Sequence, residues 1–180
     1  MRTVSIERIS PDGIDFVMKS TSPASISAKA GSSVSILYQE GKFLPGQSAE
    51  HWRSEGYCET IPLIDILHLV PMFTKTSMIA LCRINDITSS PDAKADVSEG
   101  RMAMISKSRA TEVMQTTRNG LENNTISMEE MERCITAFRF KPTRLEYMHG
   151  GPNTVMWDRW EWLYNKDTHG WAEPKHLIPH

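Results

Sequence analysis

The C-terminal segment contains a series of strand patterns that constrains the fold more than any other part of the chain. Within Val155–Tyr164 the aromatic residues Trp160, Trp162 and Tyr164 fall at every second position, so an extended chain places them on one side. Aromatic side chains at this spacing pack across a sheet and predict a core or dimer face. The pattern predicts strands at residues 144–148, 155–164 and 171–178, joined by turns at 150–153 and 165–170.

Turn residues separate further strand patterns in the N-terminal part of the chain. Ser10–Gly13 predicts a hairpin turn, because its proline presets φ and its glycine accepts a positive φ. The strand before it, Thr3–Arg8, leaves an edge that another element must cover. Strands are expected at residues 3–8, 14–18, 33–38 and 49–58, with a loop at 41–46.

Helical signals are fewer and lie mainly in the second half. Ser20–Gly31 is rich in serine and alanine and predicts one or two helical turns that stop at Gly31. Ser127 and Glu130 form a capping box, which opens a helix expected to run through about Phe138. Residues 111–118 predict a helix, residues 89–100 a loop, and residues 62–80 have a mixed period that favours neither helix nor strand.

Composition indicates one globular domain spanning residues 1–180. The chain has 180 residues, of which 39% are hydrophobic and 23% charged, so it is neither disordered nor a membrane protein. A formal net charge of -2 leaves no basic footprint for nucleic acid. We therefore expect no nucleic-acid partner and no membrane.

Cysteine usage and the N-terminal sequence predict a cytoplasmic protein. Cys58, Cys82 and Cys134 are scattered, cannot close a disulfide framework and form no CxxC pair, which favours a reducing compartment. Met1–Ile6 has a strand pattern rather than that of a signal peptide. The longest apolar stretch, Ile61–Cys82, is too interrupted by polar residues and proline for a spanning helix.

Several classes of site are excluded by missing motifs. The sequence contains no GxSxG, P-loop or GxGxxG pattern, which argues against serine-hydrolase, P-loop and Rossmann sites. The spacing of His149, His169, His176 and His180 is irregular, so no metal site is predicted. Cys58 has no paired base in the sequence, and a buried thiol is the better interpretation.

An ordered series of short motifs at both ends resembles one known family. Its C-terminal members are residues 142–148 (PTRLEYM), 149–153 (HGGPN), 157–159 (WDR), 170–171 (GW) and 177–179 (LIP). Its N-terminal members are residues 2–7, 12–16, 34–38 and 52–56. In order and spacing this series resembles the pyridoxamine 5′-phosphate oxidases, and the chain is similar to a diverged, N-terminally short member of that family.

The resemblance implies a mainly β fold with flanking helices, a split β-barrel of the FMN-binding type. Family members are typically homodimers that bind flavin mononucleotide at the subunit interface. We therefore expect a single split-barrel domain whose segment at about residues 142–180 is of the dimerisation type. FMN is the cofactor that the resemblance implies.

The resemblance assigns a set of cofactor-binding candidates. Arg2 and Ser22 match the phosphate end of the flavin, where a guanidinium suits a phosphate. Ala24 and Glu7 stand where the family has lysines, and the carboxylate of Glu7 would repel a phosphate. The remaining candidates are His51 and Arg159 near the ring and Ser106 and Ser108 at the family's Gln-Ser pair.

The substrate side of the motif is changed more. Val155 and Trp157 replace the arginine and histidine that hold pyridoxal phosphate in the family, so they are the substrate-binding candidates for a different small molecule. The leading hypothesis is an FMN-dependent oxidoreductase that acts on a small molecule other than pyridoxamine phosphate, and analogy with relatives of the family suggests a biosynthetic tailoring enzyme. The alternatives are a non-catalytic split barrel that binds another small ligand or none, and a cofactor-free catalyst in the old cleft.

Overall fold

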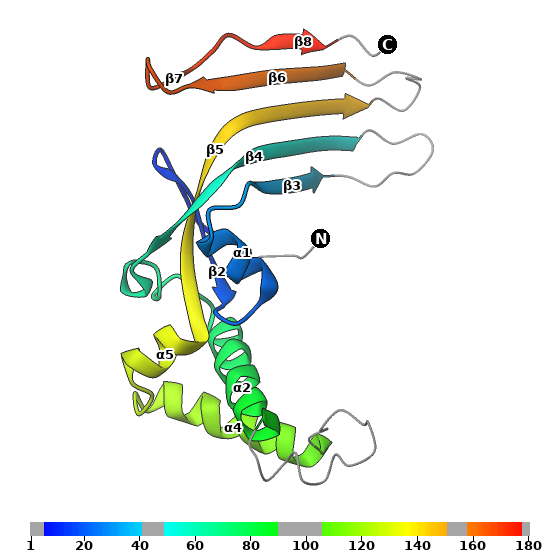
Figure 1. The fold of residues 1–180 in the computed structure, drawn as a ribbon. Coiled ribbons are helices and arrows are strands. Elements are labelled where there is room, and N and C mark those ends of the chain that lie inside the picture. The colour runs from blue at the N-terminus through cyan, green and yellow to red at the C-terminus, as the bar shows by residue number, and fades with distance from the viewer. Residues whose placement is uncertain (1–5, 41–48, 90–105, 151–157, 178–180) are drawn as a thin grey trace. The chain divides into compact units, whose positions relative to one another are not determined.

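A computed structural model describes residues 6–40, 49–89, 106–150 and 158–177, and within them the chain is mainly antiparallel β-sheet with flanking helices (Figure 1). The predicted fold class is confirmed at this level. The strands are β1 Ile6–Ser10, β2 Gly13–Lys19, β3 Val34–Glu40, β4 Ala49–Ile61, β5 Ile135–Gly150, β6 Asp158–Asn165, β7 Gly170–Trp171 and β8 Lys175–Leu177. The helices are α1 Pro23–Lys29, α2 Met72–Ser89, α4 Lys107–Glu122 and α5 Met128–Cys134, with a short 3₁₀ helix η1 at Leu63–Asp65.

The strands pair in the order β1-β2-β5-β4-β3, and β6 pairs with β5, β7 and β8. The sheet is not closed into a barrel within the described residues. The chain divides into two compact units, and β5 contributes to both. Unit 1 is Met1–Ile9, Asp15–Ile26 and Thr60–Phe138, and unit 2 is Ser10–Ile14, Ser27–Glu59 and Arg139–His180. That residues 1–180 form one domain stays a prediction.

Unit 1 contains the helices α2, α4 and α5 and a hydrophobic core. Arg83 of α2 ties these helices together, because its guanidinium donates to Glu130 of α5 at 2.8 Å and to the buried Thr117 of α4 at 3.2 Å. Phe16 of β2 stacks on Phe138 of β5 with ring centroids 5.8 Å apart. The buried cluster comprises Val17, Leu63, Ile66, Val70, Ile79, Cys82, Ile126, Cys134, Ile135 and Ala137.

The predicted helix from the capping box begins as expected but ends earlier. Ser127 caps α5, its hydroxyl accepting from the backbone N–H of Glu130 at 3.2 Å. The expectation that this helix continues to Phe138 is wrong, because α5 ends at Cys134 and Ile135 begins β5. β-Branched and aromatic residues from Ile135 onward favour a strand, and pairing in the sheet outweighs the helical spacing of their apolar positions.

Two other segments remain to be compared with the sequence prediction: one that the sequence left open and one whose predicted strand is interrupted. Residues 62–80, which favoured neither element, form η1 and the first half of α2, which begins directly after Pro71. The single last strand expected at 171–178 is interrupted: β7 ends at Trp171, and β8 begins after Pro174. Proline has no backbone N–H for the sheet ladder, which accounts for the break. The loops predicted at 41–46 and 89–100 lie outside the described residues, save Ser89, which ends α2.

Unit 2 is a sheet of β3, β4, the C-terminal part of β5, β6, β7 and β8 (Figure 1). In the antiparallel register Trp160 lies opposite Tyr147 and Glu161 opposite Glu146, so neighbouring residues of β6 face opposite sides. The predicted alternation of this strand is thus confirmed for residues 159–163, whereas Trp157 lies outside the described residues. Among the described residues, no helix combines the length and apolar character needed to cross a membrane.

Candidate functional site

One side of the unit 2 sheet carries a network of charged residues on three adjacent strands. Arg144 of β5 lies at its centre. Its guanidinium donates to Glu161 of β6 at 2.6 Å, to Glu55 of β4 at 3.3 Å, and contacts Glu146 of its own strand at 2.5 Å. We call this side the charged face; it comprises Arg53, Glu55, Arg144, Glu146, Arg159 and Glu161.

The charged face contains three arginines and three glutamates, so its formal charges sum to zero. Its carboxylates depend on the positive charge of Arg144 for their stability. Glu146 lies directly opposite Glu161 in the register, an arrangement of like charges that destabilises a sheet unless a cation bridges it. Burial opposes the charged form of Arg144, but its hydrogen bond to Glu161 and the charges of Glu146 and Glu161 raise its pKa. Glu146 is only 2% exposed, so its charge needs these partners.

Arg159, the predicted ring-side arginine, is held at the charged face by Glu146. Its Nη2 donates to Oε1 of Glu146 at 2.7 Å. Its Nε is shielded from solvent and has no hydrogen-bond partner among the residues that the structure describes. A buried donor without an acceptor is costly, which makes this nitrogen a place where a ligand atom would be favoured.

His51, the second ring-side candidate, shares this face with Arg159. It lies on β4 two residues before Arg53, with β5 between its strand and β6, and its side chain is buried. The structure therefore brings His51 and Arg159 to one side of one sheet, on strands separated by β5. Flavin binding by either residue stays a prediction.

The opposite side of the same sheet is aromatic. Trp52 of β4 packs on Tyr147 of β5 and Trp162 of β6, with ring centroids 4.5 and 6.2 Å apart. Trp160 of β6 stacks on His176 of β8 at 4.5 Å. We call the side formed by these five residues the aromatic face. Burial, with the nearby Glu50, raises the pKa of Tyr147, so its hydroxyl is protonated at neutral pH.

The predicted phosphate-side serine, Ser22, has a structural role. Its hydroxyl accepts from the backbone N–H of Ser25 at 3.1 Å and so caps the first turn of α1. Ser25 is fully buried, and its own hydroxyl finds no hydrogen-bond partner in the described part of the chain. The Ser22 cap follows from the serine's place just before Pro23, a frequent first residue of helices, and this signal is visible in the sequence.

Glu7 of β1, where the family has a lysine, is a partly buried acid. Its Oε1 is shielded from solvent and has no hydrogen-bond partner within residues 6–40, 49–89, 106–150 and 158–177. Burial raises the pKa of Glu7. The neighbouring cation, Arg8, is engaged by the buried Asp15 at 2.7 Å.

Ser106 and Ser108 lie at the start of α4, and both are exposed. Ser106 is the helix cap, its hydroxyl accepting from the backbone N–H of Arg109 at 3.2 Å, and it lies 3.1 Å from the hydroxyl of Ser108. Ser22, Ser106 and Ser108 belong to unit 1, whereas His51 and Arg159 belong to unit 2. Arg2, Val155 and Trp157 lie outside the described residues.

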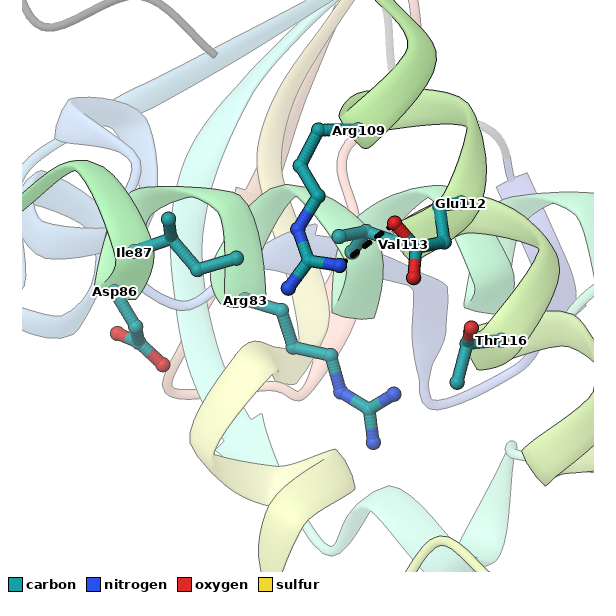
Figure 2. A pocket seen from close by; sticks show the side chains of 7 residues that line it. All are labelled: Arg83, Asp86, Ile87, Arg109, Glu112, Val113 and Thr116. Atoms are coloured by element: carbon teal, nitrogen blue, oxygen red, sulfur yellow. Dashed lines mark hydrogen bonds and ion pairs between the residues drawn. The ribbon is translucent and has the colours of Figure 1, made fainter. Parts of the chain in front are cut away.

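A cavity between α2 and α4 was not foreseen from the sequence. It measures about 430 Å³ and contains none of the predicted site residues (Figure 2). Arg109 at its edge is paired with Glu112 at 2.6 Å, and Asp86 is paired with Arg133 at 2.7 Å. Its lining residues are Arg83, Asp86, Ile87, Arg109, Glu112, Val113 and Thr116. Because these charges already have partners, the described residues that line the cavity offer no unpaired charge that would select a ligand.

Thiol and metal chemistry find little support in the described residues. Cys58 is buried, and burial raises its pKa to about 11, so the thiol is protonated and unreactive at neutral pH. No group of three or more metal-binding side chains occurs within the described part of the chain.

Comparison with known proteins supports the fold. No family model matches the sequence, and no curated protein matches it. Among solved structures, the chain is similar to a pyridoxamine 5′-phosphate oxidase-related, FMN-binding protein from Nostoc punctiforme, with a TM-score of 0.52 and 14% identity. The match covers 99% of this chain and 80% of that chain. The predicted split-barrel fold is thus confirmed: the chain shares the fold of this FMN-binding protein.

Proposed function

We propose that this chain is a flavin-binding oxidoreductase that acts on a small molecule other than pyridoxamine phosphate. The observation that carries the proposal is the buried Nε of Arg159, for which the described residues provide no acceptor. Flavin rings present carbonyl oxygens and ring nitrogens that accept hydrogen bonds. The ring end of a flavin therefore fits this donor, and the fold shared with an FMN-binding protein supports the same choice.

The phosphate end of FMN fits the described residues poorly. Ser22 is used as a helix cap, and Ala24 and Glu7 replace cations. Arg2 is the remaining candidate for this end and lies outside the described residues.

Arg159, held by Glu146, can orient and polarise a flavin ring. A bound flavin would supply hydride acceptance. Glu146 fixes the guanidinium of Arg159 through the 2.7 Å hydrogen bond, so the free Nε keeps one direction. The positive charge of Arg159 would favour electron density on the adjacent part of the ring. Val155 and Trp157, in place of an arginine and a histidine, favour a less polar substrate than pyridoxamine phosphate.

A visible spectrum of purified protein, taken after addition of excess flavin and desalting, tests the proposal. We expect retained flavin bands at about one flavin per chain. Arg159→Leu should weaken flavin binding about tenfold, the effect of losing one charge-assisted hydrogen bond. Arg53→Leu, which removes a more exposed arginine of the same face, is the matched control and should leave binding unchanged. Complete release of flavin by the unmodified protein would contradict the proposal.

The second candidate function is a non-catalytic or cofactor-free split barrel that binds another small ligand. Glu7 favours it, because an unpartnered carboxyl is a poor neighbour for a phosphate. Oxygen uptake separates the two: a flavin-loaded protein that consumes oxygen with a small-molecule substrate is an oxidase.

The three cysteines, free and buried, support a proposed cytoplasmic location.

We also propose that the chain forms a homodimer through the aromatic face. Trp52 is 39% exposed, a large apolar area for a side chain at the middle of a sheet. The three tryptophans and the tyrosine of this face are uncharged, so a second copy can pack its own aromatic residues against them without repulsion. Aromatic residues of this kind are enriched at protein interfaces.

Trp52→Lys is expected to weaken self-association at least about tenfold, since it places a charge in the middle of the proposed contact. Sedimentation velocity across a concentration series measures the change. Tyr57→Lys is the matched control, because Tyr57 is equally exposed at 38% but lies on the other side of the same strand. An unmodified protein that remains monomeric at high concentration would refute the dimer.

A further inference from the structure

Two buried thiols of unit 1 lie side by side where α5 packs on α2. Cys82 of α2 is 4% exposed, and Cys134, the last residue of α5, is fully buried. Both belong to the same hydrophobic cluster, and their side chains are hydrogen-bonded to each other. Both are free thiols in this structure. The sequence gave no sign of the pair, because the two cysteines are far apart along the chain and meet only through the fold.

The ion pairs between α2 and α5 show independently that these sides of the two helices face each other. Cys82 precedes Asp86 by four residues and Cys134 follows Glu130 by four, so each thiol lies on the same side of its helix as a residue of an ion pair. The ion pairs are Arg83–Glu130 at 2.8 Å and Asp86–Arg133 at 2.7 Å. The contact between the thiols is therefore part of a wider contact between the helices.

Two thiols that are hydrogen-bonded to each other need little movement to become a disulfide. Small side-chain rotations bring the sulfur atoms to their bonding distance of about 2.05 Å. Disulfides that form in reducing compartments are usually reversible and respond to oxidants. We propose that Cys82 and Cys134 are a modification site, which a hydroperoxide converts into an intramolecular disulfide that fixes α5 to α2.

The reaction takes two steps and one equivalent of hydroperoxide. In the first, the sulfur of one cysteine bonds to a peroxide oxygen and the O–O bond breaks. The thiol proton goes to the departing oxygen, which leaves as water or an alcohol, and a sulfenic acid remains. In the second, the other sulfur attacks the sulfenic sulfur, the S–S bond forms, and the S–O bond breaks to release water. Two electrons pass from the two thiols to the hydroperoxide.

The burial of the pair makes this oxidation slow. Burial and the hydrogen bond to Cys82 raise the pKa of Cys134 to about 12, so this thiol keeps its proton at neutral pH. Reaction therefore requires α5 to separate locally from α2. The helix has only seven residues, and its ion pairs to α2 are partly exposed, so such an opening needs less free energy than global unfolding.

Peptide mapping of the full-length protein after treatment with hydrogen peroxide tests the inference. The folded protein is oxidised, then denatured, alkylated and digested without a reductant. We expect a peptide pair joined through Cys82 and Cys134, with Cys58 alkylated, and dithiothreitol should restore both thiols. Because the bond closes a loop of about fifty residues, the oxidised protein should melt about 5–10 °C above the reduced protein.

Two variants give matched controls. Cys58 lies on β4 in unit 2, outside the hydrophobic cluster, so Cys58→Ser should form the same cross-link and show the same rise in melting temperature. Cys82→Ala should show neither. If Cys82→Ala does not fold, the mapping of the unmodified protein still decides the question.

The remaining outcomes overturn the inference. Both cysteines surviving as free thiols in the oxidised, folded protein would do so, as would their separate oxidation to sulfinic acids or a cross-link to Cys58. A Cys82–Cys134 bond that does not raise the melting temperature would overturn the fixing of α5 to α2. None of these measurements depends on flavin, so their failure leaves the proposed function intact.

Discussion

Gly56→Ala is expected to prevent the unit 2 sheet from forming, with a loss of more than about 4 kcal/mol in the free energy of unfolding. Gly56 lies on β4, and a Cβ at this position would overlap the backbone carbonyl oxygen of Lys141 on β5. It would also lie 2.9 Å from Cα of Pro142. These are backbone atoms of a paired strand, so neither can move without breaking the ladder between β4 and β5.

Chemical denaturation followed by circular dichroism measures this loss. Gly170→Ala is the matched control, because the nearest atoms to its Cβ belong to Thr168 and lie 3.9 Å away. That variant should unfold at almost the same denaturant concentration as the unmodified protein. A Gly56→Ala protein as stable as the control would show that β4 and β5 do not approach as closely as described.

Local signals in the sequence predicted those elements whose structure depends on neighbouring residues. The hairpin turn at Ser10–Gly13 follows from proline and glycine, and Gly13 has a φ of +140°. The start of α5 follows from Ser127, and the stop after α1 from Gly31, whose φ is +75°. Each of these is a property of a few consecutive residues.

Elements that depend on distant partners were predicted less well. Ile135–Phe138 has helical spacing, but its residues pair in a sheet with strands far away in the sequence. The period of an isolated segment cannot contain that information. The end of α5 was placed too late for this reason.

In the candidate site, too, the local sequence pattern predicted some features, whereas contacts with distant strands were not predicted. The alternation of β6 predicted that Arg159 and Glu161 share a side, which the register confirms. The sequence motif also contained Arg144 and Glu146, but not their partners, because Glu55 comes from another strand and meets Arg144 only through the pairing of the sheet. A pattern of charges at every second position on three strands was the signal that could have revealed the charged face.

The network around Arg144 carries the second large expected effect. Arg144→Met should lower the free energy of unfolding by about 3 kcal/mol, the lower end of the range for breaking a buried ion pair, since the guanidinium is about one-third exposed. The loss arises because Glu146 and Glu161 lie opposite each other, and the like charges of the pair repel when no cation bridges them.

Three further variants separate this explanation from a simple loss of packing. Arg144→Lys keeps the charge but cannot reach three carboxylates at once, so it should recover only part of the stability. Adding Glu161→Gln to Arg144→Met removes the repulsion and should recover about 1 kcal/mol in a double-mutant cycle. Arg53→Met removes an exposed arginine of the same face and should cost less than about 1 kcal/mol. If adding Glu161→Gln does not restore stability, Arg144 stabilises the sheet through the packing of its hydrocarbon chain. The balance of charges on the charged face would then not be what holds Arg159 in place.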